Sequence, residues 1–414
     1  MLQTLNMAKF LYGWEQSLLA ALCVSVALLG IGRVDFFSTG VSMSAWSVSR
    51  TTFFFWLTFK SFVLVRGGWA ATGLSGLSSL KPLLLFFFAV TLSLLPDFHQ
   101  AGDYRYFFFG CAHAVMLVDL FSRAPQKRWL PVLLGVLPFV LVARGLVHDP
   151  SILNLSLSQR FGYPLDHPNT AGYLFAMSVP LGVFVATATT GWRRGLSVFS
   201  CASQVFALVL TFSRGAWLGW TAAMLYLAVT LKKWIYLAAL MTVTVASVLV
   251  SPSIQDRLLS VARPYDDMAI QERLQRLTSS LRLGMDHPIL GVGYGRGRLK
   301  ESLRPYLEGT LLEDSPVLHT HNVYAELFAG TGLVGLSTFL WMSGGTLLRL
   351  WRSSLRRQGP ERLLGASLTA AWVAAIVTGL GDIPFYHHET RIYFFTLFAL
   401  AHLVVASGAG ENNR

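Results

Sequence analysis

Charged residues are scarce in this 414-residue chain, because Asp, Glu, Lys and Arg together make up only 13% of it. Hydrophobic residues reach 53%, and they gather in repeated runs of about 18 residues or more. Such runs are typical of helices that cross a lipid bilayer. The composition therefore excludes a soluble globular protein and predicts an all-α integral membrane protein.

Acidic residues are fewer than basic ones, with 21 Asp and Glu against 33 Lys and Arg, which gives a net charge of +12. A basic excess can attract nucleic acid, but in membrane proteins Lys and Arg collect in cytoplasmic loops. We therefore expect membrane lipids, and no nucleic acid, as partners. Cysteine is also rare: Cys23, Cys111 and Cys201 all lie in apolar runs, which excludes a disulfide framework and a cysteine metal site.

About twelve transmembrane helices are expected, each an apolar run between polar connectors. Their ranges are 15–33, 47–65, 82–96, 104–122, 129–147, 169–190, 195–212, 215–231, 234–250, 322–348, 363–381 and 391–408. The first run has no small-residue cleavage site after it before Arg33, so we expect it to be a retained helix rather than a signal peptide.

The connectors rich in Lys and Arg all fall on one face of this twelve-helix arrangement, together with both termini. The positive-inside rule makes that face cytoplasmic. The longest polar connections lie on the opposite, external face, which is the predicted working face, since long irregular connections are usually functional. We divide the chain into nine helices at 1–250, a large periplasmic loop at 251–320, and three helices with a cytoplasmic tail at 321–414.

The large external loop contains one amphipathic pattern, because apolar residues recur at helical spacing from Ala269 to Asp286. Asp266 or Asp267 can cap the start of this helix. Arg273 and Arg276 come off it, as anchors to lipid head groups or as ligands of a substrate anion.

A glycine-rich turn follows at 291–297, with Tyr294 as a candidate substrate contact. It does not fit the dinucleotide fingerprint, and no strand precedes it, so a nucleotide site is rejected.

The junction between the external loop and the next apolar helix carries two histidines, His319 and His321. Asn322 is the predicted N-cap of that helix, which leaves His321 just ahead of it at the water boundary. Gly332 and Gly335, further along the same run, are interpreted as small residues that let another helix pack closely.

Two chemical roles remain open for this histidine pair. A neutral imidazole near pH 7 can act as a general base toward a sugar hydroxyl. A metal site would need a third ligand, which His387, His388 or Glu389 in another external loop could supply. The alternative to both is a solvated pair.

Three further positions are candidates for the same face. Arg214 lies at a tight turn between two apolar helices, where an arginine is either functional or reaches the interface. The N-terminus of the following helix would add positive potential, which suits a phosphate. Asp382 can orient His321, pair with an arginine, or simply contact water. Asn169 or Thr170 is the expected cap of the helix that starts near 169.

These residues resemble the O-antigen ligase and polymerase superfamily of bacterial inner-membrane glycosyltransferases. The resemblance spans nearly the whole chain and rests on four local patterns. They are His321-Asn322 followed by Gly332-x-x-Gly335, Ser213-Arg214-Gly215, Arg273 upstream of the stretch 287–293, and Pro168-Asn169. The family often has a Trp shortly after this arginine, where Leu277 stands here, so Arg276 remains a rival to Arg273.

The resemblance implies a GT-C-like bundle that moves O-antigen from undecaprenyl pyrophosphate to lipid A-core at the periplasmic face, inverting and without cofactor or metal. It implies His321 as general base and Arg214 and Arg273 as a pyrophosphate clamp. His319, Asn322, Arg276, Asn169, Tyr294 and Asp382 complete the candidate substrate contacts. The same donor also serves O-antigen polymerases and protein O-oligosaccharyltransferases. A polyprenyl-linked sugar transporter is the alternative of a different class, although it predicts internal repeats that we do not find.

Overall fold

A computed structural model describes residues 2–31, 34–36, 41–71, 80–95, 103–122, 124, 128–165, 167–260, 267–313 and 319–411. The first half of the chain contains α1 (Leu2–Ile31), β1 (Val34–Phe36), β2 (Val41–Met43), α2 (Ala45–Ala71), α3 (Lys81–Leu92), α4 (Tyr104–Phe121), α5 (Leu130–Gly135), α6 (Phe139–His148), the 3₁₀ turn η4 (Pro150–Asn154) and α7 (Pro168–Ala188). The second half contains α8 (Gly191–Leu210), α9 (Arg214–Leu231), α10 (Ile235–Val250), α11 (Pro252–Leu259), α12 (Met268–Asp286), α13 (Arg296–Leu303), the 3₁₀ turn η5 (Arg304–Tyr306), α14 (Val323–Arg356), α15 (Gly359–Thr378) and α16 (His388–Glu411).

The protein is an all-α membrane protein, as predicted, and within the described ranges a small ribbon pairs β1 with β2 in antiparallel register. Each of the twelve predicted ranges overlaps a helix, and the fifth is divided into α5 and α6. The break falls before Pro138, which has no N–H to donate and stands at the N-cap of α6.

Fewer helices than the twelve predicted are long and apolar enough to span a membrane. Within the described ranges, six helices are long and apolar enough to cross a membrane, or seven if α10 and α11 form one broken span with its 113° bend. Some of the other predicted spans are short helices, such as α3 with 12 residues.

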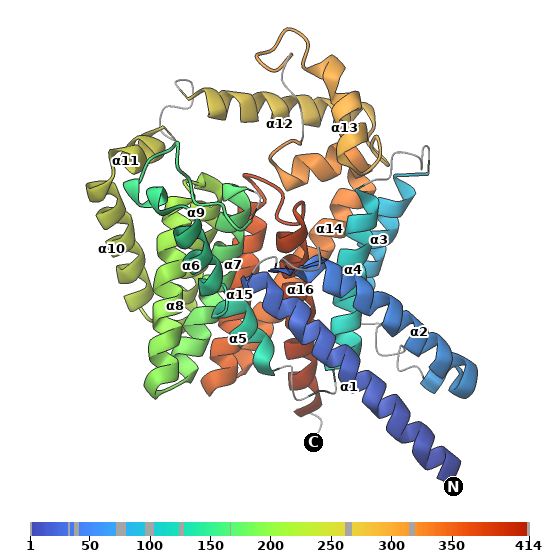
Figure 1. The fold of residues 1–414 in the computed structure, drawn as a ribbon. Helices are drawn as coiled ribbons and strands as arrows, with labels where there is room; N and C mark the ends of the chain where they lie inside the picture. The colour runs from blue at the N-terminus through green and yellow to red at the C-terminus, as the bar shows by residue number, and fades with distance from the viewer. Residues whose placement is uncertain are drawn as a thin grey trace.

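The bundle has a buried centre in which α7, α9 and α15 pack together. Gly219 of α9 allows a close approach to α15, because a Cβ there would lie 2.4 Å from the side chain of Thr378. Figure 1 shows α12 lying across one end of the bundle, near α13, while both termini lie at the other end.

The helix α14 is kinked at Gly332, whose φ of 63° and ψ of −165° are open to glycine alone among the common residues. The kink admits the chain segment that follows α12. Leu333 N–H donates to the Pro288 carbonyl at 2.7 Å, and Val292 N–H donates to the Ala329 carbonyl at 2.9 Å. These bonds pair backbone groups that the kink frees.

The prediction that Gly332 and Gly335 admit another helix is therefore wrong. A Cβ on Gly332 would lie 2.2 Å from the Ile289 carbonyl oxygen, so this glycine admits an extended segment. A Cβ on Gly335 would meet Thr331 of its own helix at 1.9 Å. The consequence for the site is that the C-terminal end of α12 is fastened to the first half of α14.

Candidate active site

Asp382 is the centre of a polar cluster at the end of the bundle that carries α12. It follows α15 and is only 6% exposed. One carboxylate oxygen, Oδ1, lies 3.2 Å from His319 Nε2, and the other, Oδ2, lies 3.5 Å from His321 Nδ1. The two imidazole rings lie 3.9 Å apart between their centres. One buried carboxylate thus contacts both histidines of the predicted pair.

The backbone around His321 is held by the start of α14. Asn322 caps that helix as predicted, and its Oδ1 accepts hydrogen bonds from the N–H groups of Tyr324 and Ala325, both at 3.0 Å. Its Nδ2 donates to the Leu380 carbonyl at 3.1 Å, which ties the cap to the loop that carries Asp382. Both ends of the Asn322 amide are therefore used in positioning the histidine loop.

His321 itself has a φ of 55°, in the left-handed region that few non-glycine residues adopt. Beside it, the Thr320 N–H donates to the buried Glu326 carboxylate at 2.9 Å. A sparsely populated backbone conformation held by several hydrogen bonds is typical of functional residues.

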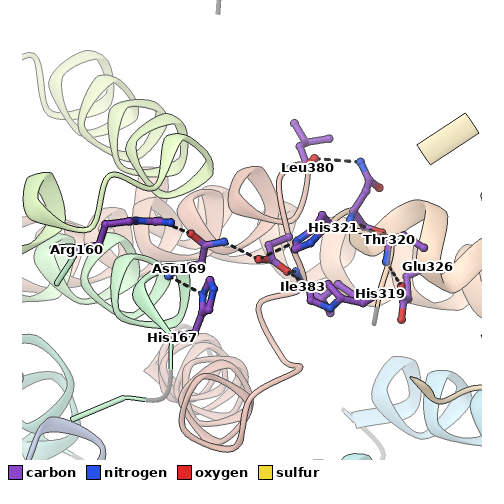
Figure 2. A network of polar contacts seen from close by, with 11 residues as sticks. Arg160, His167, Asn169, His319, Thr320, His321, Glu326, Leu380 and Ile383 are labelled. Atoms are coloured by element: carbon purple, nitrogen blue, oxygen red, sulfur yellow. Dashed lines mark hydrogen bonds and ion pairs between the residues drawn. The ribbon is translucent and has the colours of Figure 1, made fainter. Parts of the chain in front are cut away.

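A second set of contacts holds Asp382 from the opposite side. Asn169 Nδ2 donates to Asp382 Oδ2 at 3.1 Å, and Arg160 donates to Asn169 Oδ1 at 3.0 Å. Arg160 also donates through Nε to the Thr211 carbonyl at 2.7 Å. Figure 2 shows Arg160, Asn169 and His321 in a row, from the loop before α7 to the start of α14.

The cap of α7 differs from the prediction of Asn169 or Thr170. His167 is the N-cap, and its Nδ1 accepts a hydrogen bond from the Asn169 N–H at 3.1 Å. Asn169 lies within the first turn, where its side chain is free to reach Asp382. A histidine ahead of a proline took the capping role that Asn and Thr more often take.

Electrostatics favour an ionised Asp382 beside a neutral His321. Burial alone would raise the pKa of Asp382, but hydrogen bonds and charge from His319 and His321 hold it well below its usual value. Burial lowers the pKa of His321, Asp382 partly opposes this, and the charges of His319 and Arg273 lower the pKa further. His321 Nδ1 faces Asp382 Oδ2 at 3.5 Å, so a proton on Nδ1 would leave the lone pair on Nε2 with which a neutral imidazole takes a proton.

Among the described residues, His319, His321 and Asp382 are also the group that could hold a metal ion. Ligand atoms of His319, His321 and Asp382 lie within 4.8 Å of one another. The sequence analysis considered His387, His388 or Glu389 as the third metal ligand, whereas the structure places Asp382 in that position. His387 stacks on His167, and His388 packs between the aromatic rings of α2 and α4, so neither belongs to this set.

A cationic region lies next to this cluster, where α9, α11 and α12 meet. Arg214 begins α9 at the predicted tight turn, and its Nη1 donates to Asp267 and Ser260, both at 2.7 Å. Arg257 Nη1 lies 3.7 Å from the same Asp267 carboxylate. Arg214 Nη2 and Arg257 Nε are buried and have no hydrogen-bond partner within the described ranges. Unpaired guanidinium N–H groups around one carboxylate are suited to a phosphate.

Arg273 of α12 joins this region, whereas Arg276 is engaged elsewhere. The charge of Arg273 acts on His321 and on Arg160. Arg276 instead pairs with Glu272 one turn away at 3.5 Å. The charge of Arg273 thus reaches His321, which favours Arg273 over its rival.

The pKa of Arg160 reflects the positive charge of this region. Burial first, and then the charges of three neighbouring arginines, lower its pKa to about 10. Those neighbours are Arg257, Arg273 and Arg214. Asp267 is the carboxylate that faces them: burial would raise its pKa, but hydrogen bonds from Arg214 and Ser260 outweigh this and lower it.

Two of these arginines were missed from the sequence, and one candidate lies elsewhere. Arg160 stands alone in the loop before α7, and Arg257 lies on the eight-residue α11, so their only signal was a basic residue on the external face. Tyr294, predicted as a substrate contact, is 5% exposed, and its ring lies 5.3 Å from that of Phe107 in the apolar core. It makes none of the contacts described above for Asp382, His319 and His321.

Comparison with known families gives this arrangement a context. Residues 198–340 match the family model described as O-antigen ligase. This match supports membership of the O-antigen ligase/polymerase superfamily. The matched part contains Arg214, Arg273 and His321, whereas Asn169 and Asp382 lie outside it. A comparison with curated proteins gave no match.

Proposed function

We propose that this O-antigen ligase/polymerase superfamily member is a glycosyltransferase. It would move O-antigen polysaccharide from undecaprenyl pyrophosphate to a sugar hydroxyl of lipid A-core, at the periplasmic face of the bacterial inner membrane. The observation that carries the proposal is the contact of Asp382 with His321, together with Arg160, which Asn169 joins to Asp382 and which the charges of Arg214, Arg257 and Arg273 surround. This combines a proton acceptor with a region suited to a diphosphate leaving group.

The arginines serve the donor. Arg214 and Arg273 would hold the pyrophosphate, with Arg160 and Arg257 adding positive charge around it. Guanidinium groups bind phosphate oxygens bidentately and stabilise negative charge that develops in the transition state. The unpaired Nη2 of Arg214 is available for such a contact, and a bound diphosphate would compete with Asp267 for the rest of its fork.

His321 serves the acceptor. Its Nε2 would take the proton of the attacking hydroxyl while Asp382 stabilises the imidazolium that forms. The hydroxyl oxygen forms a bond to the anomeric carbon as the bond from that carbon to the pyrophosphate oxygen breaks. The bonding electron pair leaves with the diphosphate. Direct attack from the opposite face inverts the configuration, and no step requires a metal or another cofactor.

His319, Asn169 and Asn322 are positioning residues in this proposal. His319 contacts the carboxylate that orients the base, Asn169 fixes the same carboxylate, and Asn322 fixes the histidine loop. Their effect on transfer would pass through His321. Arg276 and Tyr294 have no part in the proposed chemistry.

The test is a reconstituted transfer reaction with the full chain. Lipid-linked O-antigen is supplied with lipid A-core, with a second lipid-linked unit, or with an acceptor protein. We expect product with lipid A-core. Product with the second lipid-linked unit alone would identify a polymerase, and product with the protein alone an oligosaccharyltransferase.

The transporter alternative makes a different prediction for the same assay. A transporter moves the donor across the bilayer without cleaving it, so undecaprenyl pyrophosphate would not be released with any acceptor. Release of undecaprenyl pyrophosphate that requires lipid A-core supports the ligase. If none of the three acceptors led to release of undecaprenyl pyrophosphate, the enzyme proposal would be overturned.

A further inference from the structure

A second group of aromatic and cationic side chains lies where the first turns of α2, α4 and α16 meet. The ring of Trp46 on α2 lies 5.3 Å from the Tyr106 ring of α4 and 5.3 Å from the His388 ring of α16. The rings of Tyr106 and His388 are 4.5 Å apart. These three residues, here called the aromatic cluster, have no part in the chemistry proposed above.

Two arginines lie against this cluster. The guanidinium of Arg105 is 4.7 Å from the centre of the Tyr106 ring, and its Nη2 donates to the Tyr106 hydroxyl at 2.9 Å. The guanidinium of Arg391 lies 5.4 Å from the same ring and donates to the carbonyls of Phe385 and Tyr386. Aromatic faces attract cations, so the cluster holds positive charge at its surface.

A cavity of about 570 Å³ opens beside the aromatic cluster, between α2 and α4. Phe109 of α4 belongs to both, because it lines the cavity and its ring lies 5.5 Å from that of Trp46 and 6.0 Å from that of Phe54. Arg50 stands one helical turn from Trp46 and one turn from Phe54, on the same face of α2. The cavity therefore presents one guanidinium group among aromatic rings. Its lining residues are Arg50, Thr51, Phe54, Phe55, Thr58 and Phe109.

Arg50 is exposed at this cavity, and none of the hydrogen bonds or ion pairs within the described ranges involves it. An arginine on an apolar membrane helix is costly unless it meets an anion or reaches the interface. The side chains that follow it on the outside of α2 are apolar, with Phe54 55%, Phe55 56% and Leu57 46% exposed. An available cation above an exposed apolar surface is complementary to a lipid with an anionic head.

The loop before α16 joins this region to the histidine cluster. Tyr386, whose carbonyl accepts a hydrogen bond from Arg391, has its ring 5.3 Å from the ring of His319. His319 contacts Oδ1 of Asp382, whereas Asn169, which leads to the arginines near α12, binds Oδ2. The aromatic cluster and the arginines near α12 thus reach the same carboxylate through different oxygens.

We propose that the cavity between α2 and α4 binds the acylated end of a phosphorylated glycolipid. This choice rests on the proposed function, in which lipid A-core is the acceptor. A phosphate of the lipid pairs with Arg50, since a guanidinium group binds phosphate oxygens strongly. The acyl chains lie along Phe54 and Phe55, and the first sugar rings contact the aromatic cluster. The rest of the core saccharide follows the loop before α16 toward His321, so that acceptor and donor approach the base from different sides.

The experiment measures glycolipid binding to the full chain in phosphatidylcholine nanodiscs. The probes are lipid A-core and the same glycolipid after removal of its lipid phosphates. Arg50→Gln removes the charge, and its matched control is Arg193→Gln, an exposed arginine beside Trp192 on α8. Thr58→Trp fills the cavity, and its matched control is Leu57→Trp, whose side chain is not among those that line the cavity. Thermal unfolding checks that every variant is folded.

We expect Arg50→Gln to raise the Kd of lipid A-core about tenfold or more, because a hydrogen bond between charged groups contributes about that much. Its Kd for the dephosphorylated glycolipid should change less than about twofold. Thr58→Trp should weaken both glycolipids about tenfold, since displacing two methylene groups suffices. Both controls should bind as the wild type does.

Four results overturn the proposal. They are an unchanged Kd of lipid A-core in Arg50→Gln, equal weakening of the phosphorylated and dephosphorylated glycolipids by that variant, unchanged binding of both by Thr58→Trp, and displacement of lipid A-core by an equal concentration of phosphatidylglycerol. The last result would identify a general site for anionic lipids.

Transfer assays separate this site from the proposed function. We expect Arg50→Gln to raise the KM for lipid A-core about tenfold or more, with kcat and the KM for the donor unchanged. If Arg50→Gln weakens binding as expected but the wild type transfers no glycan to lipid A-core, the glycolipid site stands and the ligase proposal fails. If the wild type transfers to lipid A-core and Arg50→Gln leaves the Kd and KM of this acceptor unchanged, the ligase stands and the glycolipid site fails.

Discussion

Asp382→Asn is the substitution that most directly probes the histidine cluster. It keeps the size of the side chain but removes the charge that faces His319 and His321. The carboxylate accepts a hydrogen bond from Asn169 at Oδ2 and one from the Ile383 N–H at Oδ1. An amide replaces one of these oxygens by an N–H₂ group, which cannot accept, so one of the two bonds is lost. The variant therefore loses both the orientation of His321 and the stabilisation of its protonated form.

The expected magnitude follows from the role of His321. A general base contributes about 10²- to 10⁴-fold to the rate, which is about 2.7–5.4 kcal/mol of activation free energy. Asp382 acts through that base, so Asp382→Asn should lower kcat within this range and by no more than His321→Ala. Residues that act as one unit are not additive, so the double variant should match His321→Ala alone.

The assay is transfer of lipid-linked O-antigen to lipid A-core at saturating donor, across pH, with thermal unfolding to confirm that each variant is folded. Asp382 partly raises the pKa of His321, so its loss should lower that pKa and move the acidic limb of the rate profile to lower pH. The plateau should fall at the same time. If Asp382→Asn transferred at the wild-type rate, or if the two substitutions multiplied, the carboxylate would not act through His321.

Three other outcomes are expected. Arg273→Gln removes a charge that lowers the pKa of His321, so the acidic limb of the rate profile should move to higher pH; an unmoved limb would show that Arg273 does not act on the base. Arg214→Lys should lower transfer at least about tenfold, because a point charge lacks the fork that pairs with phosphate, and wild-type activity in this variant would mean that charge alone suffices. Gly332→Ala should lower the melting temperature, since its φ of 63° and the nearby Ile289 carbonyl leave no room for a Cβ; the backbone conformation alone costs about 1–3 kcal/mol. The control Gly344→Ala, on the same helix with open space around it, should be neutral or stabilising, and equal melting temperatures for the two would refute this reading.

Features set by neighbouring residues could be predicted from the sequence. The apolar runs predicted the positions of the helices, and helical spacing predicted α12 with Asp266 or Asp267 as its cap, of which Asp267 is the one observed. The cap at Asn322 followed from its place before an apolar run. In each case the signal lies within a few turns of the chain, because capping and amphipathicity are local.

Features set by distant residues could not be predicted in the same way. Asn169 and Asp382 are 213 residues apart, and their hydrogen bond exists only because α7 and α15 pack side by side. The sequence left Asp382 between orientation of His321, an arginine partner and water. Packing selected the first of these contacts.

The kink in α14 shows why local pattern can mislead. Small residues on an apolar helix usually indicate a close helix–helix contact in membranes. Here the positive φ of Gly332 opens the helix for the segment after α12. That segment lies about forty residues upstream, so the pattern around Gly332 held no sign of it.

The central claim is that His321, oriented by Asp382, and the neighbouring arginines form one transfer site. The most direct measurement follows release of undecaprenyl pyrophosphate and glycosylated lipid A-core by the purified full chain, for the wild type and for His321→Ala. We predict that the wild type forms both products in equal amounts and that His321→Ala is folded, still binds the donor and forms both about 10²- to 10⁴-fold more slowly. Wild-type rates in folded His321→Ala would contradict the claim.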